Sequence, residues 1–321
     1  MGIFSASSLD MAEQKKYASA LIAVTGLFFM WGLITVLVDA MVPRLKDIFE
    51  LSNFKAGLVQ LAWFLAYFIF SIPAGFLLRK VGYKKGIIAG LAVMGLGCLI
   101  FYPAAELRFF PVFLFALFVV AGGMALLQVA ANPYISALGP ESSASSRLNL
   151  AQAFNSVGTT IAPILSAAYL LSDNIKTSAE LEELPVAEKS AYFASEASAV
   201  QGPFVLLAVV LAVLALIFLL VKLPAIKSAK IVVPYKGIFR FPHLWMAALG
   251  IFVYVGAEVA IGSFLTNYFV DMGLAAEIKA NSTLSWLVDG CGKLFKGTGI
   301  DQMDAKGIMG VFVTFYWGGA M

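Results

Sequence analysis

The sequence predicts an all-α protein that is integral to a membrane. Of its 321 residues, 61% are hydrophobic and 13% are charged, and the mean hydropathy is +0.89. Soluble domains carry about 45–50% apolar and about 25% charged residues, so this balance excludes a soluble enzyme, a disordered chain and a nucleic-acid-binding module. The two cysteines cannot form a disulfide framework, and the single histidine cannot form a multi-histidine metal site. We therefore expect neither a metal nor a cofactor.

Long apolar runs give the positions of the membrane spans. A hydrocarbon core about 30 Å thick requires about 20 apolar residues of helix. The predicted spans cover residues 17–42, 54–78, 86–105, 109–138, 148–171, 202–221 and 244–270, and an eighth run begins at residue 307. Because the chain stops inside this eighth run, we expect it to be a piece of a longer protein with about four or five further helices.

Basic residues and prolines divide the spans into two groups. Lys and Arg favour the cytoplasmic side of a membrane, and they cluster after the second span and between residues 222 and 243, where three prolines also lie. The connection 172–201 is acidic and suits the outside. We therefore expect a cytoplasmic tail over 1–16, a six-helix bundle over 17–221, a cytoplasmic linker over 222–243 and a truncated second bundle over 244–321.

Asp39 and Glu258 are the acidic residues that fall inside the predicted spans, and both are candidate sites for a coupling ion. A carboxylate in hydrocarbon costs at least about 3 kcal/mol and normally faces a cavity. Pro43 has no N–H, so the Asp39 carbonyl loses its helical partner. The alternative is that Asp39 lies in the membrane interface, and that Glu258 bonds to a backbone or polar group of further helices.

Uncharged polar and aromatic residues in the spans form a candidate sugar site. Residues 149–159 of the fifth span place amides and hydroxyls on one side of a helix, and amides both donate and accept hydrogen bonds, as a neutral sugar requires. The alternatives are hydrogen bonds between helices and ordinary packing. The candidate substrate-binding residues are Gln60, Trp63, Gln128, Asn132, Gln152, Asn155 and Tyr254.

The stretch from Gly75 to Gly86 is similar to the loop that major facilitator transporters carry between their second and third spans. Its candidate gating residues are Gly75, Arg79, Lys80, Gly82, Lys84 and Lys85. Arg79 stands where the general pattern has an acidic residue, a departure typical of the fucose–galactose–glucose permease family. Residues 130–134, 138–143, 147–156, 254–258 and 315–321 also resemble that family. The chain is most similar to its glucose/galactose branch.

This resemblance implies a major facilitator fold and cation-coupled import of a neutral hexose by alternating access. Asp39 matches the acid in the first span of the fucose branch, whereas Gln128 replaces a glutamate of that branch. The resemblance therefore leaves both a proton and sodium as candidates for the coupling ion. We expect the protein to be a monomer in the cytoplasmic (inner) membrane. Its expected partners are the sugar, the ion and the lipid bilayer, and we expect no nucleic-acid partner. Residues 281–306 are longer than the connection expected there, and we expect an exposed insertion with little order.

Two other classes of function compete with a transporter. One is a sugar-binding sensor that moves no substrate, and the other is an inactive truncated fragment. The sequence contains no Walker-type loop, which leaves ATP-driven pumping unsupported. It also shows no nucleophile–base set, so an enzyme is not expected.

Overall fold

The computed structural model consists of helices throughout the part of the chain that it describes. The described residues are 11–48, 53–107, 109–169, 185–221, 223–224, 237, 239–297, 299–303, 305, 308–309 and 311–312. The chain divides into two compact units, Met1–Ser228 and Ala229–Met321. Their boundary falls within the predicted linker 222–243, most of which lies outside the described residues.

The described helices of the first unit are long enough to cross a bilayer, since a helix rises about 1.5 Å per residue. They are α1 (Met11–Ile48), α2 (Asn53–Val81), α3 (Tyr83–Glu106), α4 (Phe110–Ala137), α5 (Ala144–Tyr169) and α7 (Val186–Leu220). The short helix η1 (Glu141–Ser143) connects α4 to α5. In the described residues, five segments meet the length and hydropathy of a membrane span: Tyr17–Leu37, Leu58–Val81, Tyr83–Glu106, Phe110–Ala137 and Gln201–Leu220.

Two helices begin well before the predicted spans. Helix α1 begins at Met11, inside the predicted tail, and helix α7 begins at Val186 rather than at residue 202. Both extensions carry charged residues, and hydropathy detects only the apolar part of a helix that projects beyond the membrane.

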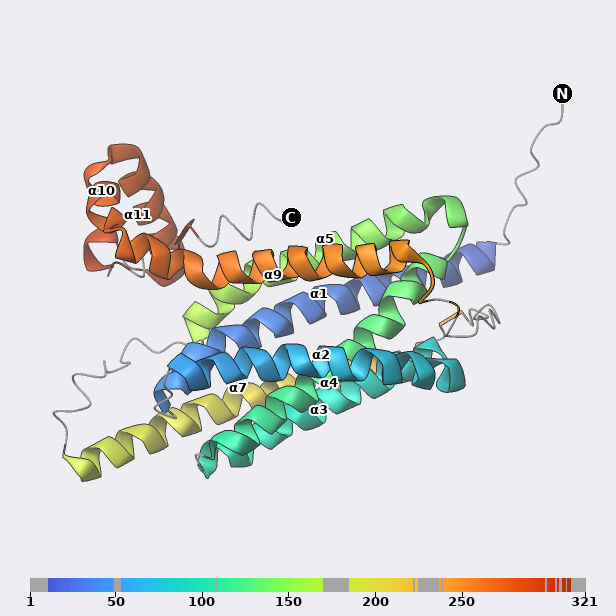
Figure 1. Cartoon of the computed structure of the whole chain (residues 1–321), viewed down its shortest axis with the longest axis horizontal. Coiled ribbons are helices and arrows are strands. Elements are labelled where there is room, and N and C mark those ends of the chain that lie inside the picture. The colour runs from blue at the N-terminus through green and yellow to red at the C-terminus, as the bar shows by residue number, and fades with distance from the viewer. Residues whose placement is uncertain are drawn as a thin grey trace. The chain divides into compact units, whose positions relative to one another are not determined.

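Glycines bring the helices of the first unit into backbone contact. Helix α1 packs on α5, while α3 packs on α4 and α7, and α4 also contacts α2 (Figure 1). A Cβ on Gly32 would come within 2.2 Å of the Asn155 carbonyl oxygen, and a Cβ on Gly158 within 2.2 Å of the Phe29 carbonyl oxygen. Gly123 approaches the Met94 backbone in the same way. Membrane helices pack through such small residues because lipid provides no hydrophobic drive between them.

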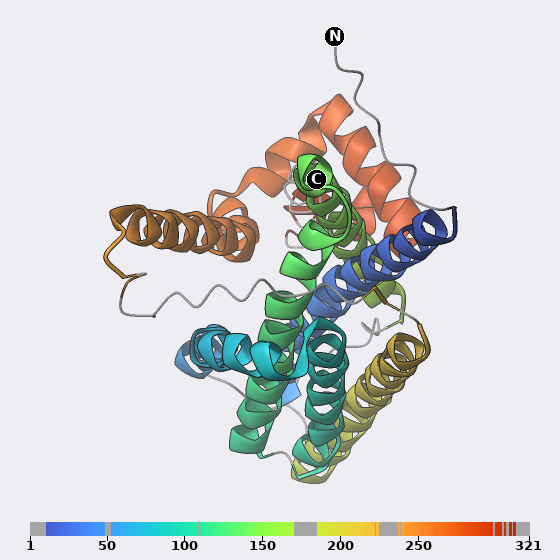
Figure 2. The same cartoon turned by 90° about the vertical axis from the view of Figure 1, so that its right-hand side faces the viewer.

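The second unit contains one long helix and a group of short ones. Helix α9 (Pro242–Asp271) covers the predicted seventh span and is followed by α10 (Leu274–Ala280), α11 (Ser282–Lys296) and η2 (Ile300–Gln302). Gly273, with φ +71°, lies between α9 and α10. Figures 1 and 2 show that α10 and α11 turn off the line of α9. The expectation of an insertion with little order over 281–306 is wrong, because α11 and η2 occupy most of it.

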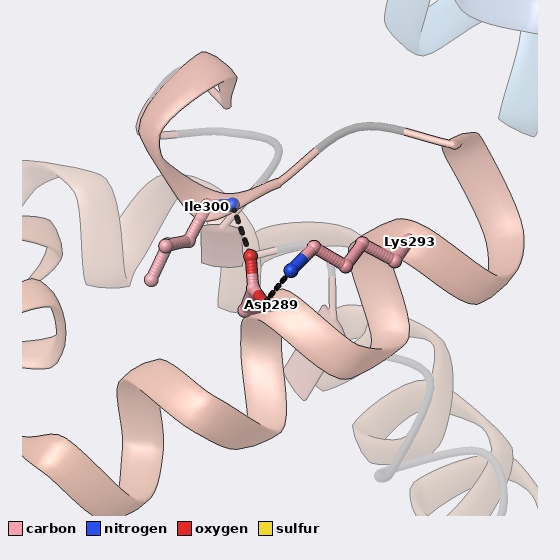
Figure 3. A network of polar contacts seen from close by, with 3 residues as sticks. All are labelled: Asp289, Lys293 and Ile300. Carbon is pink, nitrogen blue, oxygen red and sulfur yellow. Dashed lines mark hydrogen bonds and ion pairs between the residues drawn. The ribbon is translucent and has the colours of Figure 1, made fainter.

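Asp289 joins α11 to the turn that follows it (Figure 3). Its Oδ1 accepts a hydrogen bond from the Ile300 N–H at 3.0 Å, and its Oδ2 lies 2.6 Å from the Lys293 ammonium. The hydrogen bond from Lys293 and then that from the Ile300 amide lower the pKa of Asp289 below its ordinary value of 3.8. At the N-terminal end of α11, the Asn281 side chain accepts hydrogen bonds from the backbone N–H groups of Thr283 and Leu284. These polar contacts cap the start of α11 and join its middle to the turn that follows it, in a helix whose sequence contains two glycines.

We predict that Gly32→Ala destabilises the first unit, because the added methyl group would push α1 away from α5. Overpacking of this kind costs about 1–3 kcal/mol. Gly26→Ala in the same helix is the matched control, since a Cβ there meets nothing within 4 Å. Thermal unfolding in detergent should show a lower midpoint for Gly32→Ala alone. Equal midpoints for the two variants would contradict the close contact.

We also predict that the turn at Ile300 opens in acid. A carboxyl group whose pKa is lowered by folding contributes its full stabilisation above its unfolded pKa, and this is lost as the pH falls through the folded pKa. Hydrogen exchange of the Ile300 amide, corrected for its intrinsic pH dependence, should therefore accelerate severalfold as the pH falls below 3.8. Asp289→Ala, which removes the acceptor, should exchange rapidly at every pH, whereas Asp301→Ala should behave as the wild type. Slow exchange in Asp289→Ala at neutral pH would be the opposite result.

Candidate functional site

Helices α2 and α4 bring three of the polar and aromatic side chains into one cluster. Gln128 Nε2 on α4 donates a hydrogen bond to the Tyr67 hydroxyl on α2 at 3.0 Å. Trp63 lies one turn before Tyr67, with ring centroids 6.2 Å apart, and is buried. The i, i+4 spacing of Trp63 and Tyr67 puts both rings on one side of α2. Gln128 and Trp63 were candidates in the sequence, and Tyr67 emerges as the residue that connects them.

Asn132 lies one turn after Gln128 on α4, and its Oδ1 is buried. Among the described residues, Asn132 Oδ1 and Thr25 Oγ1 are the buried side-chain polar atoms that have no hydrogen-bond partner. A buried polar atom without a partner costs about 1–3 kcal/mol. Both atoms are therefore suited to accept or bind a polar group that enters the unit, and Thr25 carries no sequence signal that distinguishes it from other span residues.

Asn155 on α5 contacts α1 where the two helices approach each other closely at Gly32 and Gly158. Its Nδ2 donates to the Phe28 carbonyl oxygen at 3.0 Å. This bond uses one of the two amide N–H groups, as expected for an interhelical hydrogen bond in a membrane protein. Gln152, three residues earlier, and Gln60 on α2 are exposed in the first unit. The structure thus joins Trp63 and Gln128 through Tyr67, and gives Asn155 a contact with α1.

The two acidic candidates lie in different units. Asp39 belongs to α1, but its side chain lies outside those that the structure describes. Glu258 is half-buried on α9, one turn after Tyr254, whose side chain is 64% exposed. Among the described residues, no group of three or more His, Cys, Asp or Glu side chains is placed to hold a metal ion.

The structure reduces the predicted loop between α2 and α3 to the single residue Gly82, and its basic residues lie in the two helices and make different contacts. Gly82 has φ +80° between the two helices, a conformation that side chains rarely adopt. The Lys84 ammonium donates to the carbonyl oxygens of Leu219 and Val221, each at 2.9 Å. These carbonyls end α7, so Lys84 places a positive charge at the negative end of that helix. Arg79 lies over the Phe76 ring at 5.3 Å, while Lys80 and Lys85 are exposed.

Tyr134 holds the chain just beyond the Lys84 contact. Its hydroxyl donates to the Pro224 carbonyl oxygen at 3.2 Å, and its ring lies 5.9 Å from that of Tyr83. Lys84 and Tyr134 together hold Val221 and Pro224, where the chain leaves α7 for the predicted linker. The candidate gating loop is therefore attached to the end of α7, a contact that motif comparison does not reveal. Gly75 lies within α2, before the loop.

Arg147 is a buried cation at the start of α5. Its guanidinium donates to the carbonyl oxygens of Ile135, Ser136 and Pro140, and to the Ser143 hydroxyl. The planar fork of Arg suits several acceptors at once. Two of these acceptors, the Ile135 and Ser136 carbonyl oxygens, lie in the last turn of α4, so Arg147 joins the start of α5 to the end of α4.

In the second unit, a cavity of about 300 Å³ lies among α9, α10, α11, Met309 and Phe312. Its lining is mostly apolar, with Phe269, Leu274, Leu284 and Met309, and Glu277 supplies a carboxyl group. None of the residues predicted to bind sugar contributes to it.

Comparison with known proteins assigns the family. Residues 20–321 match the Major Facilitator Superfamily. The chain belongs to this superfamily. Its members are multi-pass membrane transporters and not enzymes, so the prediction that the chain is not an enzyme is confirmed. The structure is also similar to that of the Escherichia coli fucose:proton symporter FucP, with a TM-score of 0.70 and 37% identity over 80% of this chain and 64% of the symporter. The predicted all-α major facilitator fold is confirmed.

The major facilitator relatives carry the names of sugar transporters. The chain is 41% identical over 315 residues to a protein of Brucella abortus biovar 1 (strain 9-941) named glucose/galactose transporter, covering 97% of this chain and 66% of the relative. It is 38% identical over 283 residues to the L-fucose-proton symporter of Escherichia coli (strain K12), covering 85% of this chain and 65% of the relative. The chain thus spans just under two thirds of these relatives. The predicted resemblance to the sugar permeases is confirmed.

We predict that Lys84→Met destabilises this major facilitator protein because two carbonyl oxygens at the end of α7 lose a charged donor. A hydrogen bond to a charged group contributes about 1.5–3 kcal/mol when buried, and partial exposure reduces this to about 1–2 kcal/mol. Lys85→Met makes the same change in net charge at an exposed neighbouring position and is the control. Thermal unfolding in detergent should separate the two variants. A lower midpoint for Lys85→Met than for Lys84→Met would contradict the conclusion that Lys84 stabilises the end of α7.

Proposed function

We propose that this protein is a secondary active transporter that imports a neutral hexose, glucose, galactose or a related sugar, across the cytoplasmic membrane. The observation that carries the proposal is the 41% identity to a glucose/galactose transporter over 97% of this chain. The polar cluster of the first unit supports it, because it contains amide, hydroxyl and aromatic groups. Amides and hydroxyls exchange hydrogen bonds with sugar hydroxyls, and aromatic rings pack on the C–H faces of sugars.

In this proposal, Gln128, Tyr67 and Trp63 form part of the sugar site, with Asn132, Asn155, Gln60, Gln152 and Tyr254 as further contacts. Asp39 and Glu258 are the proposed coupling groups, because a carboxyl group within a membrane can bind a proton or a cation. Either a proton or sodium fits this chemistry. The basic clusters favour a cytoplasmic N-terminus under the same proposal, and the protein works as a monomer.

The test is uptake of radiolabelled glucose and galactose by vesicles that contain the purified protein, under a proton gradient, a sodium gradient or neither. Asp39→Asn should abolish accumulation above the equilibrium level, while exchange of internal for external sugar persists. Gln128→Leu should weaken sugar binding about fivefold or more, since a hydrogen bond contributes about 1 kcal/mol net.

Gln201→Leu is the matched control for Gln128→Leu. The Gln201 amide donates to the Tyr102 carbonyl oxygen, away from the proposed contacts, so its loss should leave sugar affinity unchanged. Equal accumulation by Asp39→Asn and the wild type would contradict the proposed coupling role. Unchanged sugar affinity in Gln128→Leu would contradict the proposed sugar site.

A further inference from the structure

Helix α11 has two faces of opposite environment. Leu284, Val288 and Cys291 point inward and join a small hydrophobic core with Ile278 and Ile300. Trp286 lies opposite this core and is 75% exposed, and Leu294 is 77% exposed. At 100° per residue, Leu294 lies about 80° around the helix from Trp286 and about 12 Å further along its axis. The outer side therefore carries these two large apolar side chains among polar residues, of which Lys293 is the nearest in angle to Trp286.

The length and composition of α11 exclude a transmembrane role. A helix of 15 residues extends about 22 Å, which is shorter than a hydrocarbon core of about 30 Å. Asp289 and Lys293 also lie near its middle and end. A short helix of this kind can instead lie in the plane of the membrane surface, with its exposed Trp286 and Leu294 at the boundary between headgroups and acyl chains.

The position of α11 in the chain keeps it near that surface. Helix α9 covers a predicted membrane span and ends at Asp271, and only the seven-residue α10 separates its end from α11. Seven helical residues extend about 10 Å. Figures 1 and 2 show both short helices turning off the line of α9, so α11 does not continue away from the membrane along that axis.

The inner contacts hold the exposed face in place. The Asp289 side chain binds the Ile300 amide at 3.0 Å and the Lys293 ammonium at 2.6 Å (Figure 3). These bonds, with Val288 fully buried, fix the rotation of α11 about its axis. Trp286 and Leu294 therefore stay on the outside instead of turning into the small core.

The charges of the insertion point to apolar rather than electrostatic binding. Residues 274–312 contain four acidic and four basic side chains, so their net charge is zero. Lys293 is already paired with Asp289. Tryptophan favours the interface between lipid and water, where its ring is buried and its N–H stays hydrated. Residues 274–312 therefore offer no excess positive charge that would attract a nucleic acid or an acidic protein surface.

We propose that α11 is an interfacial helix, and that its Trp286 and Leu294 face binds the lipid surface of the bilayer into which α9 inserts. The binding arises from burial of these two side chains. It is therefore insensitive to the charge of the lipid headgroups. It also anchors the insertion against the membrane beside the end of α9.

The test is quenching of Trp286 fluorescence in nanodiscs made with brominated phosphatidylcholine. The Trp286 signal is the difference between the wild type and Trp286→Phe, which conserves an aromatic ring at the surface. We expect bromines near the headgroup end of the acyl chains to quench this signal at least about twofold more strongly than bromines near the bilayer centre. Replacing about a third of the lipid by phosphatidylglycerol should leave the quenching unchanged.

A second pair of variants tests the apolar face itself. Leu294→Asp should reduce bromolipid quenching of Trp286 by about half or more, because a carboxylate opposes burial in lipid. Lys279→Asp, at an exposed position on α10, should leave it unchanged. Quenching of Trp286 by aqueous iodide without quenching by bromolipid would overturn the proposal. Protection from both quenchers would also overturn it, because another protein surface would then cover the face.

Discussion

The contact of α1 with α5 at Gly32 and Gly158 sets the geometry of the polar residues in the first unit. At this crossing the two backbones are so close that a single added carbon would lie 2.2 Å from a carbonyl oxygen. The short separation lets the Asn155 amide reach the Phe28 carbonyl oxygen. Gly90 and Gly123 produce a similar contact between α3 and α4, and α4 carries Gln128 toward Tyr67 on α2. The reach of the Asn155 amide to α1 therefore depends on glycines, whose lack of a side chain allows the two backbones to approach.

A second constraint acts at the ends of the helices, where carbonyl oxygens lack partners within the helix. Arg147 satisfies carbonyls at the end of α4, and Lys84 satisfies two at the end of α7. Both cations come from a neighbouring helix, so Arg147 joins α5 to α4 and Lys84 joins α3 to α7. Lys84, close to the turn between α2 and α3, therefore stabilises the first unit, in addition to any part it takes in the proposed transport cycle.

Hydropathy predicted the parts of the fold that depend on contact with lipid. The spans within α1, α2, α3, α4 and α7 follow from runs of apolar residues. Hydropathy does not predict the charged start of α7 at Val186. It also does not predict α11, because its two glycines and mixed charges are typical of a loop. It also could not show that Tyr67 is the partner of Gln128, or that Lys84 reaches α7, because such pairs depend on how helices approach each other. For Asn155, the sequence left two interpretations, and the contact with Phe28 supports a bond between helices.

The neutral amide at position 128 limits how coupling can work in the proposed transporter. A carboxylate at this depth would need a proton or a counter-ion, whereas Gln128 needs only a hydrogen-bond partner, which Tyr67 provides. Within the predicted spans, Asp39 and Glu258 are then the carboxyl groups that can exchange a proton or bind a cation, one in each unit. Sugar contacts built from amides and hydroxyls keep the same charge throughout the cycle. The affinity of those contacts should therefore change little with pH, and the dependence of transport on the coupling ion should reside in the two carboxyl groups.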